Sequence, residues 1–183
     1  MDQRRRGDIM MLIPGQLVSL ATFPGVIVHE TAHMWFCKLR NVAVLDVCFF
    51  RIGNPAGYVV HEEIKVFNTA LMVSLGPLIV NSLLCIFICF PAFLPLRVFG
   101  VESILSYFLL WLGISIGMHA FPSSGDGYAL YQNAKKAASS GSILAILSFP
   151  LVLLIYLANI GRIFWLDYLY GAVIGLGLPT LLL

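Results

Sequence analysis

Charged side chains are scarce in this chain. Only 11% of its 183 residues are Asp, Glu, Lys or Arg, and the formal net charge is +2. The few basic residues are scattered, so the chain lacks the basic surface of a nucleic-acid-binding protein, and no nucleic-acid partner is expected. Hydrophobic residues make up 60% of the sequence and the mean hydropathy is +0.92, which indicates an integral membrane protein in contact with a lipid bilayer.

Cysteines are also few, and their spacing predicts neither a disulfide framework nor a cysteine zinc motif. Cys85 and Cys89 lie in an apolar run, where they are expected to pack as small hydrophobic residues. No small-residue cleavage site follows Arg4–Arg6, so the first apolar stretch is expected to be retained. The length predicts a single membrane-embedded domain over residues 1–183.

Long apolar segments predict about five transmembrane helices, because a bilayer is crossed by ~20 residues of helix. The segments are residues 9–37, 68–90, 101–120, 141–160 and 164–183. Pro24-Gly25 is expected to break the first span, and Pro91 and Pro95 are expected to end the second. The expected fold is an all-α polytopic membrane protein, with a core over about 9–138 and additional spans over about 141–183.

The segment between the first two spans has a different composition. Residues 42–50 and 58–60 are rich in β-branched and aromatic residues, and Gly53–Gly57 between them are typical of a turn. This pattern predicts a small membrane-associated β-hairpin. Its free edge could pair with an extended peptide, or the hairpin could be a connection with no role in binding. A polar loop over 121–128 and a short interfacial helix over 129–140 are expected later in the chain.

His29-Glu30-Thr31-Ala32-His33 forms an HExxH motif in the first span. Histidines four residues apart lie on one face of a helix, so both imidazoles can bind one zinc ion. The glutamate between them can take a proton from zinc-bound water. The alternative is a helix with two polar-facing histidines and an ion-paired glutamate. Three ionisable groups in five membrane residues are costly without a metal, which favours zinc.

Asp126 is the candidate for the third zinc ligand. If the first span ends at Lys38, the second span leaves that side and the third returns to it, so Asp126 reaches the same membrane face as the histidines. A catalytic zinc ion usually has three protein ligands, which predicts one zinc per chain. Gly125 and Gly127 would let the backbone bend toward the metal. The alternative is that Asp126 is a turn or helix-capping residue.

Such a site would hydrolyse a peptide bond. Zinc polarises the carbonyl, and Glu30 carries the water proton to the leaving amine. The oxyanion that forms needs a further donor, for which His119 and Asn81 are candidates. The alternatives are a packed interfacial histidine and an asparagine that bonds between helices. His61 is expected to face solvent.

These motifs together resemble the site-2 protease family of intramembrane zinc metalloproteases. The HExxH motif is followed by Gly57-Tyr58-Val59, which resembles the Gly-Tyr-Val of the family's hairpin. Gly76-Pro77 with Asn81 resembles its Gly-Pro-x-x-Asn signature, and Asp126-Gly127 resembles its Asp-Gly. The resemblance covers about residues 24–128.

The resemblance implies a three-helix core with zinc bound by His29, His33 and Asp126, and Glu30 as the catalytic base. It also implies that the substrates are transmembrane or membrane-proximal segments of other proteins. The hairpin edge at Gly57, Tyr58 and Val59 would then hold the unfolded substrate as an added strand.

The chain departs from the family pattern in several places. Asn81 lies one residue further from Gly76 than is usual, and His119 stands where the family has an asparagine. Pro122 is closer to Asp126 than usual. We expect no PDZ-like or CBS-like module and no further span before that of HExxH in these 183 residues, which would make the chain a minimal version of the family's domain.

Two other functions fit the composition. The first is a catalytically inactive zinc-binding membrane protein that acts as a binding module or chaperone for membrane segments, although such a protein would not need Glu30. The second is a transporter, which the lack of an inverted repeat disfavours.

Arg4–Arg6 favour a cytoplasmic N-terminus, which would put the site at the outer face. Six basic residues on the side of the site favour the cytoplasmic face, and we prefer that orientation: Lys38, Arg40, Arg51, Lys65, Lys135 and Lys136.

Overall fold

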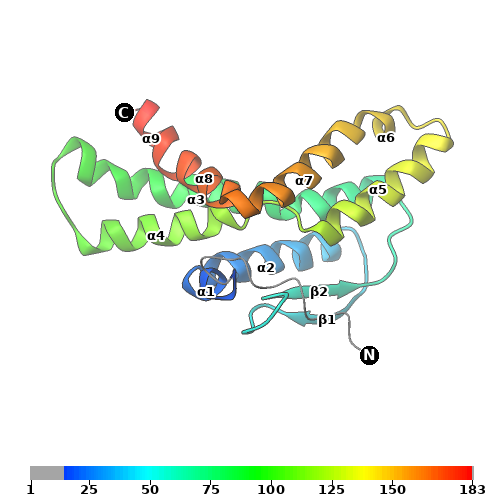
Figure 1. Ribbon diagram of the computed structural model, residues 1–183, viewed down its shortest axis with the longest axis horizontal. Coiled ribbons are helices and arrows are strands. Elements are labelled where there is room, and N and C mark those ends of the chain that lie inside the picture. Colours follow the sequence, from blue (N-terminus) through cyan, green and yellow to red (C-terminus); the bar gives the residue numbers. More distant parts are fainter. Residues whose placement is uncertain (1–14, 183) are drawn as a thin grey trace.

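The computed structural model describes residues 15–182, which form helices and one two-stranded sheet (Figure 1). Arg4–Arg6 and the first residues of the first predicted span lie outside the described residues. In chain order the elements are α1 (Gly15–Ala21), α2 (Phe23–Leu39), β1 (Val44–Cys48), β2 (Tyr58–His61), α3 (Phe67–Val98), α4 (Ile104–Met118), α5 (Ser124–Ser139), α6 (Ile143–Leu147), α7 (Phe149–Gly161), η1 (Arg162–Phe164), α8 (Leu166–Ala172), η2 (Val173–Gly177) and α9 (Leu178–Leu182).

The predicted break in the first apolar segment is confirmed. Helix α1 ends at Ala21, and α2 begins at Phe23 with Pro24 in its first turn. Proline costs little there, because the first amides of a helix have no helical acceptor. Thr22 lies at the break, and its hydroxyl donates to the carbonyl of Val18 at 2.6 Å. The histidines of the motif therefore belong to a separate helix of 17 residues.

The β-hairpin is also confirmed. Strands β1 and β2 pair antiparallel, with Cys48 opposite Tyr58 and Val44 opposite His61. In Figure 1 the hairpin lies along α2, and β2 is on the α2 side of β1. The edge of β2 that is not paired with β1 has no other strand beside it in the described part of the chain.

Two boundaries differ from those expected. Helix α3 does not end at Pro91 but continues through Pro91 and Pro95 to Val98. Each proline removes one donor from the helix, whereas an end at Pro91 would free several backbone groups in apolar surroundings. Helix α5 begins at Ser124 rather than near 129, so the predicted loop is shorter and Asp126 lies in the first helical turn.

Helices α2, α3 and α4 pack together through small residues. A Cβ atom added to Gly25 would lie 2.0 Å from the carbonyl oxygen of Ser115, so α2 and α4 are in backbone contact there. An added Cβ at Gly117 would lie 2.7 Å from the Cys85 sulfur, and one at Gly113 would lie 2.3 Å from the Cys89 sulfur. Both cysteines are fully buried between α3 and α4, as expected of small hydrophobic residues.

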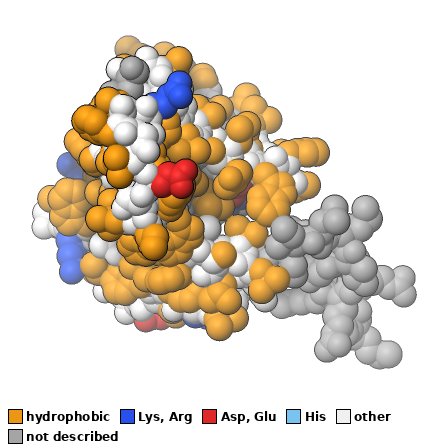
Figure 2. All heavy atoms as spheres, turned by 90° about the vertical axis from the view of Figure 1, so that its left-hand side faces the viewer, with side chains coloured by type: hydrophobic (Ala, Val, Ile, Leu, Met, Phe, Trp, Pro, Cys, Tyr) orange, Lys and Arg blue, Asp and Glu red, His pale blue; other side chains and the backbone are white. Residues whose placement is uncertain are grey.

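Within residues 15–182, two helical segments are long and apolar enough to cross a membrane: α3, and the continuous stretch Ile143–Phe164. Helix α4 and the stretch Leu166–Leu182 are apolar but shorter. Hydrophobic side chains cover most of the face in Figure 2, and Phe87 is 70% exposed on α3. Large exposed apolar surfaces are rare on soluble monomers and mark contact with lipid or protein.

The contact at Gly25 gives a test of the helix packing. We expect Gly25→Ala to lower the free energy of unfolding by about 3 kcal/mol, because the added methyl group meets a backbone oxygen that cannot move aside. Gly177→Ala is the matched control, since the nearest atom to its added Cβ is 3.8 Å away. Thermal unfolding in detergent measures both. Equal stability of the two variants would contradict the close approach of α2 and α4.

Candidate metal centre

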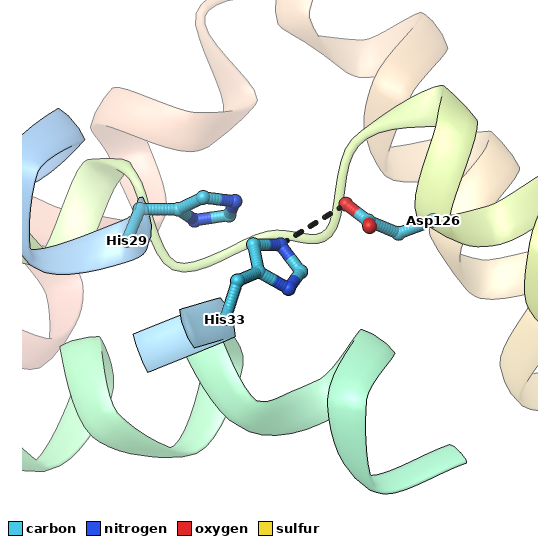
Figure 3. A group of neighbouring side chains, drawn as sticks. All are labelled: His29, His33 and Asp126. Carbon is cyan, nitrogen blue, oxygen red and sulfur yellow. Dashed lines mark ion pairs between the residues drawn. The ribbon is translucent and has the colours of Figure 1, made fainter. Parts of the chain in front are cut away.

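Two helices bring three potential metal ligands together. His29 and His33 project from adjacent turns of α2, and Asp126 comes from the first turn of α5. One ligand atom from each side chain lies within 4.8 Å of the other two (Figure 3). The three residues that the sequence nominated as a zinc site therefore form one cluster, although Asp126 lies 93 positions after His33 in the chain.

The spacing between His33 and Asp126 suits two ligands of a tetrahedral zinc ion. The Nε2 atom of His33 lies 3.4 Å from Oδ2 of Asp126. Zinc bonds of ~2.1 Å in tetrahedral geometry put neighbouring ligand atoms about 3.4 Å apart. Two imidazoles and one carboxylate are also a common donor set of catalytic zinc, which keeps a fourth position open. The donor chemistry of the three residues fits the metal, and so does the spacing of the His33–Asp126 pair.

Backbone carbonyls fix the orientation of both imidazoles. Nδ1 of His29 lies 2.6 Å from the carbonyl oxygen of His119, and Nδ1 of His33 lies 3.1 Å from that of Val73. A carbonyl oxygen only accepts hydrogen bonds, so each Nδ1 carries the proton and donates it. The Nε2 of the neutral imidazole then carries the lone pair that binds a metal, and His33 presents it once a metal displaces the proton shared with Asp126.

Asp126 is positioned by the start of α5. The backbone amide and the hydroxyl of Ser123 donate to its Oδ2 at 2.8 and 2.6 Å, and its own amide bonds back to the Ser123 hydroxyl at 3.2 Å. This is a capping box, and a serine three residues before an acidic residue is its sequence signal. Asp126 is therefore a capping residue and a member of the cluster at once. The two interpretations of this residue do not exclude each other.

Electrostatics keep Asp126 ionised. Burial alone would raise the pKa of its carboxyl group, but the charge and hydrogen bond of His33 and the hydrogen bond from Ser123 lower that pKa below its ordinary value. The backbone carbonyl of Asp126 accepts a separate hydrogen bond, from the hydroxyl of Ser74 on α3 at 3.4 Å. A charged carboxylate is the form that binds a metal.

Glu30 lies beside the cluster without belonging to it. Its side chain is buried, and it packs against the hairpin at Gly57. A Cβ atom at Gly57 would lie 2.7 Å from Cγ of Glu30 and 3.0 Å from the Val26 side chain. Only glycine fits this contact without displacing a neighbour. The sequence connected Gly57 with a peptide ligand, but it gave no signal that Gly57 touches Glu30.

The other hairpin residues lie further from the cluster. The hydroxyl of Tyr58 donates to Asp46 at 3.0 Å, and its ring stacks under Arg51. Val59 pairs with Val47 across the sheet. His61 lies in β2, where its Nδ1 is 2.8 Å from the carbonyl of Glu62, outside the metal cluster.

His119 and Asn81 lie next to the cluster, but their side-chain donors point elsewhere. Nε2 of His119 lies 2.8 Å from the Thr22 hydroxyl, which itself donates to Val18. The backbone carbonyl of His119, rather than its ring, contacts His29. The amide nitrogen of Asn81 faces three backbone carbonyls of α2 and of the end of α4. The structure therefore directs neither side-chain donor toward the position that the three ligands enclose.

Comparison of the chain with protein-family models, with curated proteins and with solved structures found no match.

The donor set predicts a specific effect of Asp126→Asn. Asparagine keeps an oxygen for the capping box but loses the charge, so α5 should form while zinc affinity falls. The loss should exceed the ~10–100-fold that follows removal of a group outside the ligand shell. Elemental analysis of detergent-purified protein should give about one zinc per wild-type chain and little in the variant. Asp46→Ala, which changes an exposed carboxylate of the hairpin, is the control. Full zinc content in Asp126→Asn would exclude Asp126 as a ligand.

Proposed function

We propose that this protein is an intramembrane zinc metalloprotease that cleaves peptide bonds in or near transmembrane segments of other membrane proteins. The convergence of His29, His33 and Asp126 beside the buried carboxylate of Glu30 carries this proposal. Three protein ligands leave the fourth position of a zinc ion open to water. A nearby carboxylate that is free of the metal is what a hydrolytic site requires.

The resemblance to the site-2 protease family supports the same function. The motifs that carry the resemblance are far apart in the sequence, yet each contacts α2, the helix that carries the two histidines. Gly57 packs on Glu30, and an added Cβ at Gly76 would lie 2.3 Å from the Phe36 ring of α2. Asn81 bonds to the carbonyl that orients His29. Motifs unrelated in function would have no reason to meet at one site.

The proposed chemistry divides between the metal and the protein. Zinc held by His29, His33 and Asp126 would supply an acidified water and polarise the scissile carbonyl. The protein aligns the imidazoles through the carbonyls of His119 and Val73. Glu30 accepts a proton and returns it to the leaving amine, which is typically worth ~10²–10⁴-fold in rate.

The hairpin offers a place where an extended substrate could bind. A peptide bond in a helix is shielded by its own hydrogen bonds, so a helical segment must unfold locally before it is cut. The free edge of β2 offers backbone groups that can pair with such a strand. Gly57 precedes β2 and touches Glu30, so a strand added there would run close to the base. This arrangement favours a binding role for the hairpin over that of a mere connection.

In the membrane we propose about five spans, with the metal centre near the cytoplasmic face. Helix α3 and the stretch Ile143–Phe164 have the length to cross. The other spans would be the first apolar segment with α2, helix α4 and the C-terminal stretch from Leu166. Three lysines favour the cytoplasmic side: Lys38 at the end of α2, Lys65 just before α3, and Lys136 near the end of α5.

A zinc-binding protein without protease activity, which would bind membrane segments or act as their chaperone, is the second candidate. The same three ligands and the same hairpin would serve it. The buried position of Glu30 favours the protease, since its carboxylate has no ion-pair partner among the described residues and burial of such a group is costly unless it has a function.

The proposed topology can be tested by labelling introduced cysteines in a Cys48→Ser background. Asn54→Cys in the hairpin and Ser140→Cys after α5 should react from one side of sealed vesicles. Glu102→Cys, between α3 and α4, should react from the other, because α3 would separate it from the hairpin. All three positions are exposed. Reaction of Glu102→Cys and Asn54→Cys from the same side would show that α3 does not cross.

The protease proposal predicts the effect of Glu30→Gln. We expect cleavage to fall by ~10²–10⁴-fold, because glutamine cannot accept the proton. Zinc content should stay close to one per chain, because Glu30 is not a ligand. The assay uses vesicles that contain the protein and a tagged single-span protein with a Gly-Pro pair in its span, and mass spectrometry locates the cut. Undiminished cleavage by the variant would exclude Glu30 as the base. Zinc binding without cleavage by wild type would favour the inactive alternative.

A further inference from the structure

Asn81 occupies the point where α2, α3 and α4 meet. Its side chain is fully buried, at 0% exposure. The amide nitrogen lies 3.1 Å from the carbonyl oxygen of Ile116, 3.2 Å from that of His119 and 3.4 Å from that of Gly25. One side chain on α3 therefore donates to the start of α2 and to the end of α4.

Two of these carbonyls lie at the end of α4, where helical hydrogen bonding runs out. The carbonyl of the C-cap residue His119 has no partner within the helix, and that of Ile116 accepts only the His119 amide at 3.2 Å. The end of α4 is buried, so water does not replace that partner readily. Asn81 thus caps α4 from a neighbouring helix, and its two N–H groups suit several carbonyls at once.

Two of the three carbonyls also hold His29. The carbonyl of His119 accepts the Nδ1 proton of His29 at 2.6 Å. The carbonyl of Gly25 lies four residues before His29, which is the position that accepts the backbone N–H of His29 in an α-helix. Asn81 therefore fixes the acceptor of the imidazole and the acceptor of the backbone amide of the same residue.

The amide oxygen of Asn81 has no partner among the described residues. A buried acceptor without a donor is costly, so a residue chosen only for packing at this position would be apolar. The side-chain N–H groups of Asn81, which face the three carbonyls, therefore account for an asparagine at this position. A reversed amide would turn its oxygen toward three carbonyl oxygens, which excludes that orientation.

From these contacts we propose that Asn81 is a positioning residue for the metal centre. It holds the carbonyl of His119 in place, and that carbonyl turns the Nε2 lone pair of His29 toward the metal. This role differs from that of an oxyanion donor, since the amide protons are directed at the protein backbone. The inference rests on the metal site of the proposed function, but it does not depend on proteolysis.

The test measures zinc affinity in a Glu30→Gln background, so that no cleavage step enters the result. Zinc is titrated against a competing chelator with Asn81 intact and with Asn81→Ala. We expect affinity to fall ~10–100-fold, the usual effect of removing a group that orients a ligand. Ser82→Ala is the matched control, because Ser82 is the next residue of α3 and bonds to Tyr170 at 2.7 Å, away from the cluster. Its zinc affinity should stay unchanged.

A second measurement separates positioning from general stability. We expect zinc to raise the melting temperature of the background protein and of Ser82→Ala by the same amount. The rise should be smaller in Asn81→Ala, and intermediate in Asn81→Ser, which keeps one donor. If Asn81→Ala does not fold, Asn81→Ser still carries the comparison.

Equal zinc affinity and an equal zinc-dependent rise in all variants would overturn the inference. If zinc binding were unchanged in Asn81→Ala but cleavage by the protein with Glu30 intact fell, Asn81 would act as an oxyanion donor instead. A different result would contradict the protease proposal alone. In that case the wild-type protein would bind zinc and cleave nothing, while Asn81→Ala would still weaken zinc binding.

Discussion

The geometry of the metal cluster depends on two hydrogen bonds from imidazoles to backbone carbonyls. His29 donates to the end of α4, and His33 donates to α3. Because the acceptors are backbone atoms, the direction of each imidazole is set by the distance between helices rather than by a neighbouring side chain. Close packing at Gly25 and Gly76 is therefore a condition for aligned ligands, since a shift of α2 against either helix would move a carbonyl away from its histidine.

Asp126 shows how one group can satisfy two requirements. An acidic residue in the first turn of a helix is stabilised by the free amides there, and the Ser123 bonds use this preference. The same carboxylate lies 3.4 Å from Nε2 of His33. Its position is held by the start of α5 before any metal binds. A preformed carboxylate lowers the cost of assembling the site, because the side chain loses little further freedom.

The sequence predicted the parts of the site that depend on local pattern or on the parity of membrane crossings. Four-residue spacing puts His29 and His33 on one face, and the two spans expected after them would return Asp126 to the same side. The hairpin followed from its β-branched runs.

The continuation of α3 through Pro91 was not predictable, because the cost of proline must be compared with that of freeing backbone groups in apolar surroundings. The bonds of Asn81 and His119 were not predictable either, since they depend on which helix ends meet in space. Among the described residues, two of the five expected spans are helices that are long and apolar enough to cross a membrane.

The hairpin connects substrate binding with catalysis in the proposed function. Gly57 lies on Glu30, and β2 begins at the next residue. A strand that pairs with β2 would therefore be held by the same element that packs against the base. This coupling suits hydrolysis in apolar surroundings, because it would bring the scissile bond close to the base that takes the proton from water. Pairing at β2 brings the peptide to the side of Glu30 that the hairpin already covers, so binding and alignment of the scissile bond would occur in one step.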